Sequence, residues 1–254
     1  MSFTESIKKE FSTRTLVLIP VAIAINIVVG QLVMLLKLPI YMDSIGTVLV
    51  GALAGPWAGA LTGALGNIIW GLTLYPLALP FFYVAAVIGA MAGIAAKLGA
   101  FDRSSPRWLS ALIGGFFFFG LTLFVLSLTA FSRDGLIPNS ADLIRQYTLV
   151  FVVTLIIGLA IGYFLLKKSG YAGLAGLVTG VVAAIISAPT AAIVFGGVTG
   201  AGTDLLVAAF RASGASILAS TMAQGAVSDP FDKMVSFLIV WLIIQSLPAR
   251  FKAR

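Results

Sequence analysis

Long runs of apolar residues alternate with short polar segments along the whole chain. The apolar runs cover residues 15–36, 43–55, 57–74, 79–98, 108–131, 147–166, 171–197 and 231–247. Most are long enough for a membrane helix. The second run is short and continues through Gly55-Pro56-Trp57 into the third, which predicts a tight helical hairpin. The pattern predicts an all-α, polytopic membrane helical bundle with about six to eight transmembrane helices.

The polar segments divide the chain into three expected regions. Residues 1–14 form a polar N-terminal segment, 15–168 a six-helix membrane body, and 169–254 additional membrane helices with an outer loop at about 198–230. That loop is moderately apolar and rich in Ser, Thr and Gly. Three interpretations stay open for it: an interfacial helix, a re-entrant segment, or a cap over the outer face.

The distribution of charged residues predicts how the chain is oriented in the membrane. Only 10% of the 254 residues are charged and 60% are hydrophobic, whereas soluble domains carry about 25% charge. Eleven of the 16 Lys and Arg residues fall in loops on the side of the N-terminus. The positive-inside rule then predicts both termini in the cytoplasm, an N-in/C-in multi-pass protein of the plasma membrane. The net charge of +7 has no aromatic–basic surface motif beside it, so nucleic acid is not an expected partner.

The chain contains no cysteine and no histidine. This excludes disulfides, thiolate or imidazole metal sites, and the usual nucleophile–base pairs of enzymes. No Gly-rich phosphate loop followed by Lys occurs, so the chain is not a self-sufficient ATP-driven pump. We therefore expect no catalysis, no cofactor and no metal site.

Pairs of glycines spaced four residues apart recur in the apolar runs. They are Gly51/Gly55, Gly59/Gly63, Gly89/Gly93, Gly158/Gly162 and Gly176/Gly180. In lipid, helices gain little from hydrophobic burial against one another, and small residues let two backbones approach closely. The pairs predict a compact bundle and do not by themselves indicate its function.

Polar and aromatic residues gather at one expected outer mouth. Asp43 is either a solvated N-cap of the second helix or a ligand-facing carboxylate. Asn67 is expected either to bond a neighbouring helix or to point into a cavity. Aromatic residues follow it, and they form either an interfacial belt or the wall of a site for a planar polar ligand. They are Trp70, Tyr75, Phe81, Phe82 and Tyr83.

Three further polar features carry structural interpretations. The stripe Ala22, Asn26, Gly30 on the first helix either docks a partner helix or packs inside the bundle. Ser187 before Pro189 is expected to accompany a kink, because "SAPTAA" breaks the seventh helix. In the segment 228–233, "SDPFDK", Asp229 is the expected N-cap, with Pro230 at the first helical position and Asp232 near the positive end of the helix dipole.

The motif "GxLxGPxxGAxxGAxxN" resembles the substrate-binding S components of energy-coupling factor (ECF) transporters. It comprises Gly51, Leu53, Gly55, Pro56, Gly59, Ala60, Gly63, Ala64 and Asn67. The resemblance is sharpest over residues 15–100. It implies a prokaryotic membrane subunit that captures a vitamin-like micronutrient and delivers it inward with a transmembrane T component and a pair of ABC ATPases. The implied binding residues are Tyr41 to Asp43 and Trp70 to Tyr83, with Asn67 below them.

This sequence departs from the S-component pattern in two places. Many S components carry an Ala-x-x-x-Ala stripe for docking to the T component, and the corresponding face here is Ala22, Asn26, Gly30. The chain also extends beyond a six-helix body. The alternative from another class is a membrane sensor or receptor domain of a signalling system. An output domain is the feature that separates the two, and the chain ends about six residues past the last apolar run.

Overall fold

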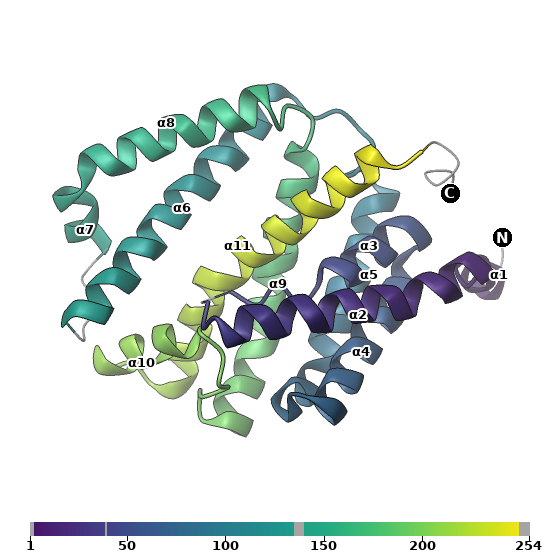
Figure 1. Cartoon of the computed structure of the whole chain (residues 1–254), viewed down its shortest axis with the longest axis horizontal. Helices are drawn as coiled ribbons and strands as arrows, with labels where there is room; N and C mark the ends of the chain where they lie inside the picture. Colours follow the sequence, from purple (N-terminus) through teal and green to yellow (C-terminus); the bar gives the residue numbers. More distant parts are fainter. Residues whose placement is uncertain (1–2, 39, 135–139, 249–254) are drawn as a thin grey trace. The chain divides into compact units, whose positions relative to one another are not determined.

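The computed structural model describes residues 3–38, 40–134 and 140–248, and every regular element in this part of the chain is helical (Figure 1). The all-α expectation is therefore confirmed. The elements in chain order are α1 (Phe3–Glu10), α2 (Thr13–Leu35), α3 (Ile45–Ala54), α4 (Pro56–Thr73), the 3-10 helix η1 (Pro76–Phe81), α5 (Phe82–Lys97), α6 (Arg107–Asp134), α7 (Ser140–Gln146), α8 (Thr148–Phe164), α9 (Gly170–Phe195), α10 (Asp204–Ala212) and α11 (Ile217–Ser246).

Four stretches of the described chain are long and apolar enough to cross a membrane. They are Thr13–Leu35, Pro76–Lys97, Arg107–Ser127 and Gly170–Phe195. α3 and α8 are apolar but shorter. Many large apolar side chains on these helices are exposed, among them Val28, Leu112 and Ile185, as expected for surfaces that face lipid. Length and composition together indicate a membrane protein.

The chain folds as two compact units. Unit 1 comprises Met1–Asp102 with Ala175–Arg254, and unit 2 comprises Arg103–Leu174. This division differs from the expected one at residue 168. The reason is that the C-terminal helices pack on the N-terminal ones: Tyr83 on α5 donates a hydrogen bond to the carbonyl of Ile186 on α9, and α11 contacts α3.

Glycines allow α3, α4 and α5 of unit 1 to meet backbone to backbone. A Cβ on Gly59 would lie 2.5 Å from the carbonyl oxygen of Gly89, and one on Gly63 would lie 2.1 Å from that of Ala85. Gly180 on α9 meets Pro230 on α11 in the same way, at 2.3 Å. These approaches are closer than any residue with a Cβ permits, so the close packing predicted from the glycine spacing is confirmed.

Unit 2 is built around the pair α6 and α8. A Cβ on Gly158 would lie 2.4 Å from the carbonyl oxygen of Gly114. Thr122 on α6 donates a hydrogen bond to Thr154 on α8 over 2.9 Å. Both contacts use small or β-branched residues in place of long side chains, so the two helices run close together along their length.

α11 begins earlier than the sequence indicates. Its N-cap is Ser216, whose hydroxyl accepts a hydrogen bond from the backbone N–H of Ala219. Asp229 and Pro230 therefore lie in the middle of the helix, and the interpretation of Asp229 as an N-cap is wrong. α9 likewise continues through Pro189 to Phe195, so the expected break at Ser187 is not found.

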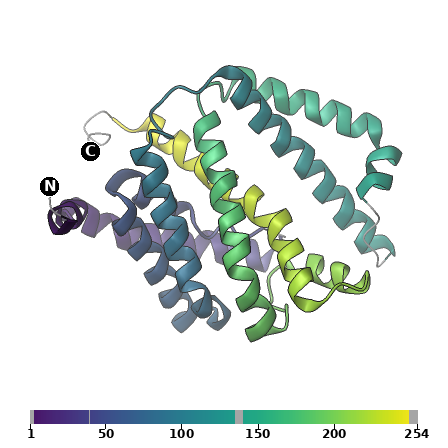
Figure 2. The same cartoon turned by 180° about the vertical axis from the view of Figure 1, so that it is seen from behind.

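The segment 198–230 contains no separate span. It forms the short helix α10 and the first turns of α11. α10 is amphipathic and buries Leu206, Val207 and Ala209 in unit 1. The N-terminal segment also holds a helix, α1, which lies at the same end of unit 1 as the last turns of α11 (Figures 1 and 2).

Candidate functional site

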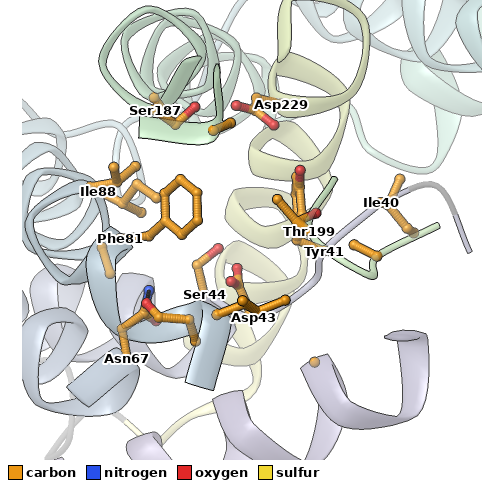
Figure 3. A pocket seen from close by; sticks show the side chains of 18 of the residues that line it. Ile40, Tyr41, Asp43, Ser44, Asn67, Phe81, Ile88, Ser187, Thr199 and Asp229 are labelled. Atoms are coloured by element: carbon orange, nitrogen blue, oxygen red, sulfur yellow. Dashed lines mark hydrogen bonds between the residues drawn. The ribbon is translucent and has the colours of Figure 1, made fainter. Parts of the chain in front are cut away.

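A cavity of about 110 Å³ lies inside unit 1 (Figure 3). Its walls come from α2, α4, η1, α5, α9 and α11, together with the loop 36–44 and the segment 196–203. The polar and aromatic side chains that line it are Tyr41, Asp43, Ser44, Asn67, Trp70, Tyr75, Phe81, Ser187, Thr199, Gln224, Asp229 and Lys233, and the remaining wall is apolar.

Lys233 on α11 is the centre of an ion-pair cluster beside the cavity. Its side chain is 3% exposed. The ammonium group donates to Asp232 Oδ2 over 2.5 Å, to Ser44 Oγ over 3.1 Å and to Asp43 Oδ1 over 3.2 Å. Asp232 also accepts a hydrogen bond from the backbone N–H of Met42 over 2.8 Å. The cluster fastens the loop after α2 to α11.

Asp229 lies one helical turn before Lys233 and belongs to a different network. Gln224 donates to the hydroxyl of Ser228 over 2.7 Å, and that hydroxyl donates to Asp229 Oδ1 over 3.1 Å. Asp229 is 6% exposed and lines the cavity. Its second oxygen, Oδ2, receives no hydrogen bond from any residue that the structure describes.

Several aromatic rings line the cavity. Trp70 donates from Nε1 to Gln31 over 3.1 Å, and its ring centroid lies 5.3 Å from that of Tyr75. The Tyr75 hydroxyl donates to the carbonyl oxygen of Thr199. Burial, with a smaller contribution from nearby Asp204, raises the pKa of Tyr75 to about 12, so its hydroxyl remains a donor at neutral pH.

The loop 36–44 and the segment 196–203 are held against each other. Lys37 donates from Nζ to the carbonyl oxygen of Gly200 over 2.8 Å. The Tyr41 hydroxyl shares a hydrogen bond with Thr203 over 2.9 Å. Burial, followed by the charge of Asp229, holds the pKa of Tyr41 above its ordinary value. Thr199 and Ala201 contribute to the cavity wall, so this segment closes part of the site.

The sequence leaves open whether Asn67 bonds a neighbouring helix or points into a cavity, and its side chain does both. Its side chain is 9% exposed and lines the cavity. The amide nitrogen donates to the carbonyl oxygen of Ala78 over 3.4 Å, at the long end of hydrogen bonding. Across residues 3–38, 40–134 and 140–248, no donor reaches its amide oxygen. Asn67 therefore offers an acceptor to the cavity.

The structure brings most of the sequence-predicted binding residues together. Tyr41, Asp43, Asn67, Trp70 and Tyr75 all line the cavity. Asp43 is not the N-cap of α3, because Ser44 holds that position and Asp43 pairs with Lys233.

Phe82 and Tyr83 lie outside the cavity lining. Phe82 is exposed, and Tyr83 bonds α9 through Ile186 and Thr190. Their neighbour Phe81 lines the cavity in their place.

Sequence reasoning missed the contribution of α11 to the site. Gln224, Asp229 and Lys233 all come from this helix and all line the cavity. The available signal was the apolar residues on both sides of "SDPFDK", which are unusual around a solvated loop.

The stripe Ala22, Asn26, Gly30 packs inside unit 1. Ala22 is fully buried, and Asn26 donates to Thr47 over 2.8 Å and accepts from the N–H of Gly46 over 2.7 Å. A Cβ on Gly30 would lie 2.8 Å from the Trp70 ring. Of the two interpretations that the sequence leaves open for this stripe, the structure shows the packing one, with α3 and α4 covering it.

Within the described ranges, no group of three His, Cys, Asp or Glu residues is placed to hold a metal ion. Comparisons of the chain with protein-family models, with characterised proteins and with solved structures found no match.

Proposed function

We propose that this chain is the substrate-binding membrane subunit of an ECF-type ABC importer, and that its ligand is a vitamin-like micronutrient. The observation that carries the proposal is the cavity in unit 1, where a few polar groups converge among apolar and aromatic walls. Small-molecule sites are typically concave and mostly apolar, with a small number of polar groups that orient the ligand.

The proposed protein crosses the plasma membrane of a prokaryote six to eight times, with both termini in the cytoplasm. Two observations support this orientation. α1 carries Lys8 and Lys9, and its last residue, Glu10, pairs with Lys97 at the end of α5, so basic residues gather at this end as they do at cytoplasmic ends. α1 also shares its end of unit 1 with the last turns of α11. The cavity then faces outward, where the ligand enters.

A transmembrane T component and a pair of ABC ATPases supply the energy in this proposal. The proposal of these partners is supported by the resemblance to S components, which lies in the motif from Gly51 to Asn67. The motif has a structural use here, because Gly51 and Gly59 let α3 and α4 approach α5. Asn67 lies at its end and reaches the cavity.

Mass spectrometry of small molecules released from the purified protein tests the proposal. The protein is purified from rich medium in mild detergent, as wild type, Asn67→Leu and Ile69→Leu. Ile69 is exposed on the same helix and lies outside the cavity lining, so it is the matched control. We expect a stoichiometric vitamin-like compound in wild type and Ile69→Leu, and its loss in Asn67→Leu with little change in folded yield.

Co-expression with a T component and its ATPases provides the second readout. We expect the three proteins to copurify and to accumulate the released compound in an ATP-dependent way. A cavity that yields no small molecule, with no ATPase or T component on the same column, would overturn the proposal and favour a membrane sensor. Equal loss of yield and ligand in Asn67→Leu would show that Asn67 is structural.

A further inference from the structure

Acidic groups outnumber basic groups at the cavity. The ionisable groups within the cluster and its network are the acids Asp43, Asp229 and Asp232 and the base Lys233. An ammonium group has three N–H donors, and Lys233 uses all three on Asp232, Ser44 and Asp43. A negatively charged ligand would therefore meet two carboxylates and find no free cationic donor.

The acceptors that remain open face the cavity. Asp229 Oδ2 and the amide oxygen of Asn67 belong to side chains that are 6% and 9% exposed, and neither receives a hydrogen bond from the described chain. In Figure 3 they reach the cavity from α11 and α4. A buried carboxylate without a cation is costly, so a cationic ligand would supply what Asp229 lacks.

The aromatic side of the cavity suits the same ligand. Trp70, Tyr75, Phe81 and Tyr41 line it. Aromatic faces attract organic cations electrostatically and stack on planar rings. The cavity of about 110 Å³ favours a small ligand.

We propose that the site selects a small planar organic cation, with Asp229 as its counter-ion and Asn67 as a second acceptor. The inference rests on the proposed function and narrows its ligand class. The cation donates a charge-assisted hydrogen bond to Asp229 Oδ2 or places its charge beside that oxygen, while its ring lies against Trp70 and Phe81. Asp43 keeps its contact with Lys233 and adds to the negative potential.

Matched probes that differ in charge test the inference directly. Isothermal titration calorimetry of the full-length protein in mild detergent compares 1-methylnicotinamide with neutral nicotinamide, and benzylammonium with benzyl alcohol. We expect each cation to bind at least ~10-fold more tightly than its neutral partner, as a charge-assisted hydrogen bond to a buried carboxylate predicts. The inference is overturned if the neutral compounds bind equally well, or if no cation binds.

Asp229→Asn separates a ligand-directed charge from a structural one. This variant keeps the shape and the hydrogen bond from Ser228 but removes the charge. We expect it to lose the preference for cations while the unfolding temperature of the empty protein stays the same or rises. Asp142→Asn is the matched control, because it removes an acid whose side chain is 69% exposed in unit 2.

A stability loss in Asp229→Asn together with an unchanged cation preference would assign Asp229 a structural role and overturn the inference. If the variant fails to fold, the wild-type comparison of cations with neutral compounds decides alone. Failure of the inference is distinguishable from failure of the proposed function. A neutral or anionic compound released from the purified protein would overturn the inference of a cationic ligand. It would still support the proposed function as a substrate-binding subunit.

Discussion

Two buried ion-pair clusters lie at opposite ends of α2 and α4, and their charges are satisfied to different degrees. At the start of α4, Glu10 accepts hydrogen bonds from the backbone N–H groups of Trp57 and Ala58 over 2.8 and 3.3 Å, and from Lys97 over 3.1 Å. One acid meets one base and the positive end of a helix dipole. At the cavity, Asp43 and Asp232 share Lys233, and Asp229 keeps an open oxygen.

This difference in hydrogen bonding distinguishes buried carboxylates that stabilise the fold from a carboxylate that is available to bind a ligand. A buried carboxylate that only holds the fold together has both oxygens hydrogen-bonded, as Glu10 does. Asp232 follows the same rule, with Lys233 and the N–H of Met42 as donors. Asp229 departs from it and lines a cavity. The departure marks the place where the protein lacks a partner and a ligand can supply one.

Helix packing differs between the two ends as well. Near the Glu10 end, α4 and α5 touch backbone to backbone at Gly59 and Gly89. Two turns further along α4, the position of a Cβ on Gly66 has no neighbour closer than 3.8 Å. The contact with α5 near Glu10 is therefore backbone to backbone, whereas position 66, nearer the cavity, has room for a methyl group.

Lys233→Met should give the largest effect, because it leaves the partly buried Asp43 and the fully buried Asp232 without their cation. Breaking a buried ion pair by removing one partner costs about 3–5 kcal/mol. We expect a large fall in the yield of folded protein and in its unfolding temperature in mild detergent. The double variant Lys233→Met/Asp232→Asn is the control, since it removes both charges of the shortest pair. It should recover part of the loss, and no recovery would contradict the account of the cluster.

Gly89→Ala tests the packing side of the comparison. The added Cβ would lie 2.1 Å from the carbonyl oxygen of Gly59, so α4 and α5 must move apart at a cost of about 1–3 kcal/mol. Gly66→Ala is the matched variant, and it should be neutral or stabilise by up to about 1 kcal/mol because the site has room and glycine is a poor helix former. Thermal unfolding of both variants measures the contrast. Equal losses would show that the packing does not loosen toward the cavity.

Glu10→Gln should weaken the fold moderately and leave ligand binding unchanged. The amide retains an acceptor for the N–H of Trp57 but loses the charge that faces Lys97. Because the Lys97 side chain is 55% exposed, solvent reduces the value of the pair, and we expect a loss of about 1–2 kcal/mol. Glu5→Gln, an exposed position on α1, is the control. A change in ligand affinity in Glu10→Gln would break the separation between the two clusters.

The sequence predicts the helices better than it predicts the site. The apolar runs place α2 to α6, α8 and α9 with small errors at the ends, because each run is a local signal, whereas α7, α10 and the first half of α11 were not predicted. Asp43, Asn67 and Trp70 are identifiable because they are polar or aromatic groups inside or beside such runs. Their joint placement around one cavity follows from the hairpin at Pro56, which returns α4 alongside α3.

The contribution of α11 to the cavity could not be predicted from such local signals. A Ser-Asp-Pro sequence obeys the local rules for a helix start, and only tertiary packing makes it the middle of a helix. Lys233 meets Asp43 across 190 positions of sequence, and Glu10 meets Lys97 across 87. The stripe Ala22, Asn26, Gly30 is visible as a small face, but the sequence does not reveal that α3 and α4 cover it. Long-range partners decide all three cases.

Tyr75 gives the most specific effect, a pH dependence that arises at the cavity end. Burial raises its pKa from 10.0 to about 12. The unfolded chain therefore releases this proton first, so the stability that Tyr75 contributes is complete below pH 10 and is lost as the pH rises through about 12. Unfolding temperatures over this range should fall less in Tyr75→Phe than in wild type. The control is Tyr171→Phe, outside the cavity, whose unfolding temperature should depend on pH as in wild type. If the unfolding temperature of Tyr75→Phe shows the same pH dependence as wild type, the hydroxyl of Tyr75 titrates as it does in the unfolded chain.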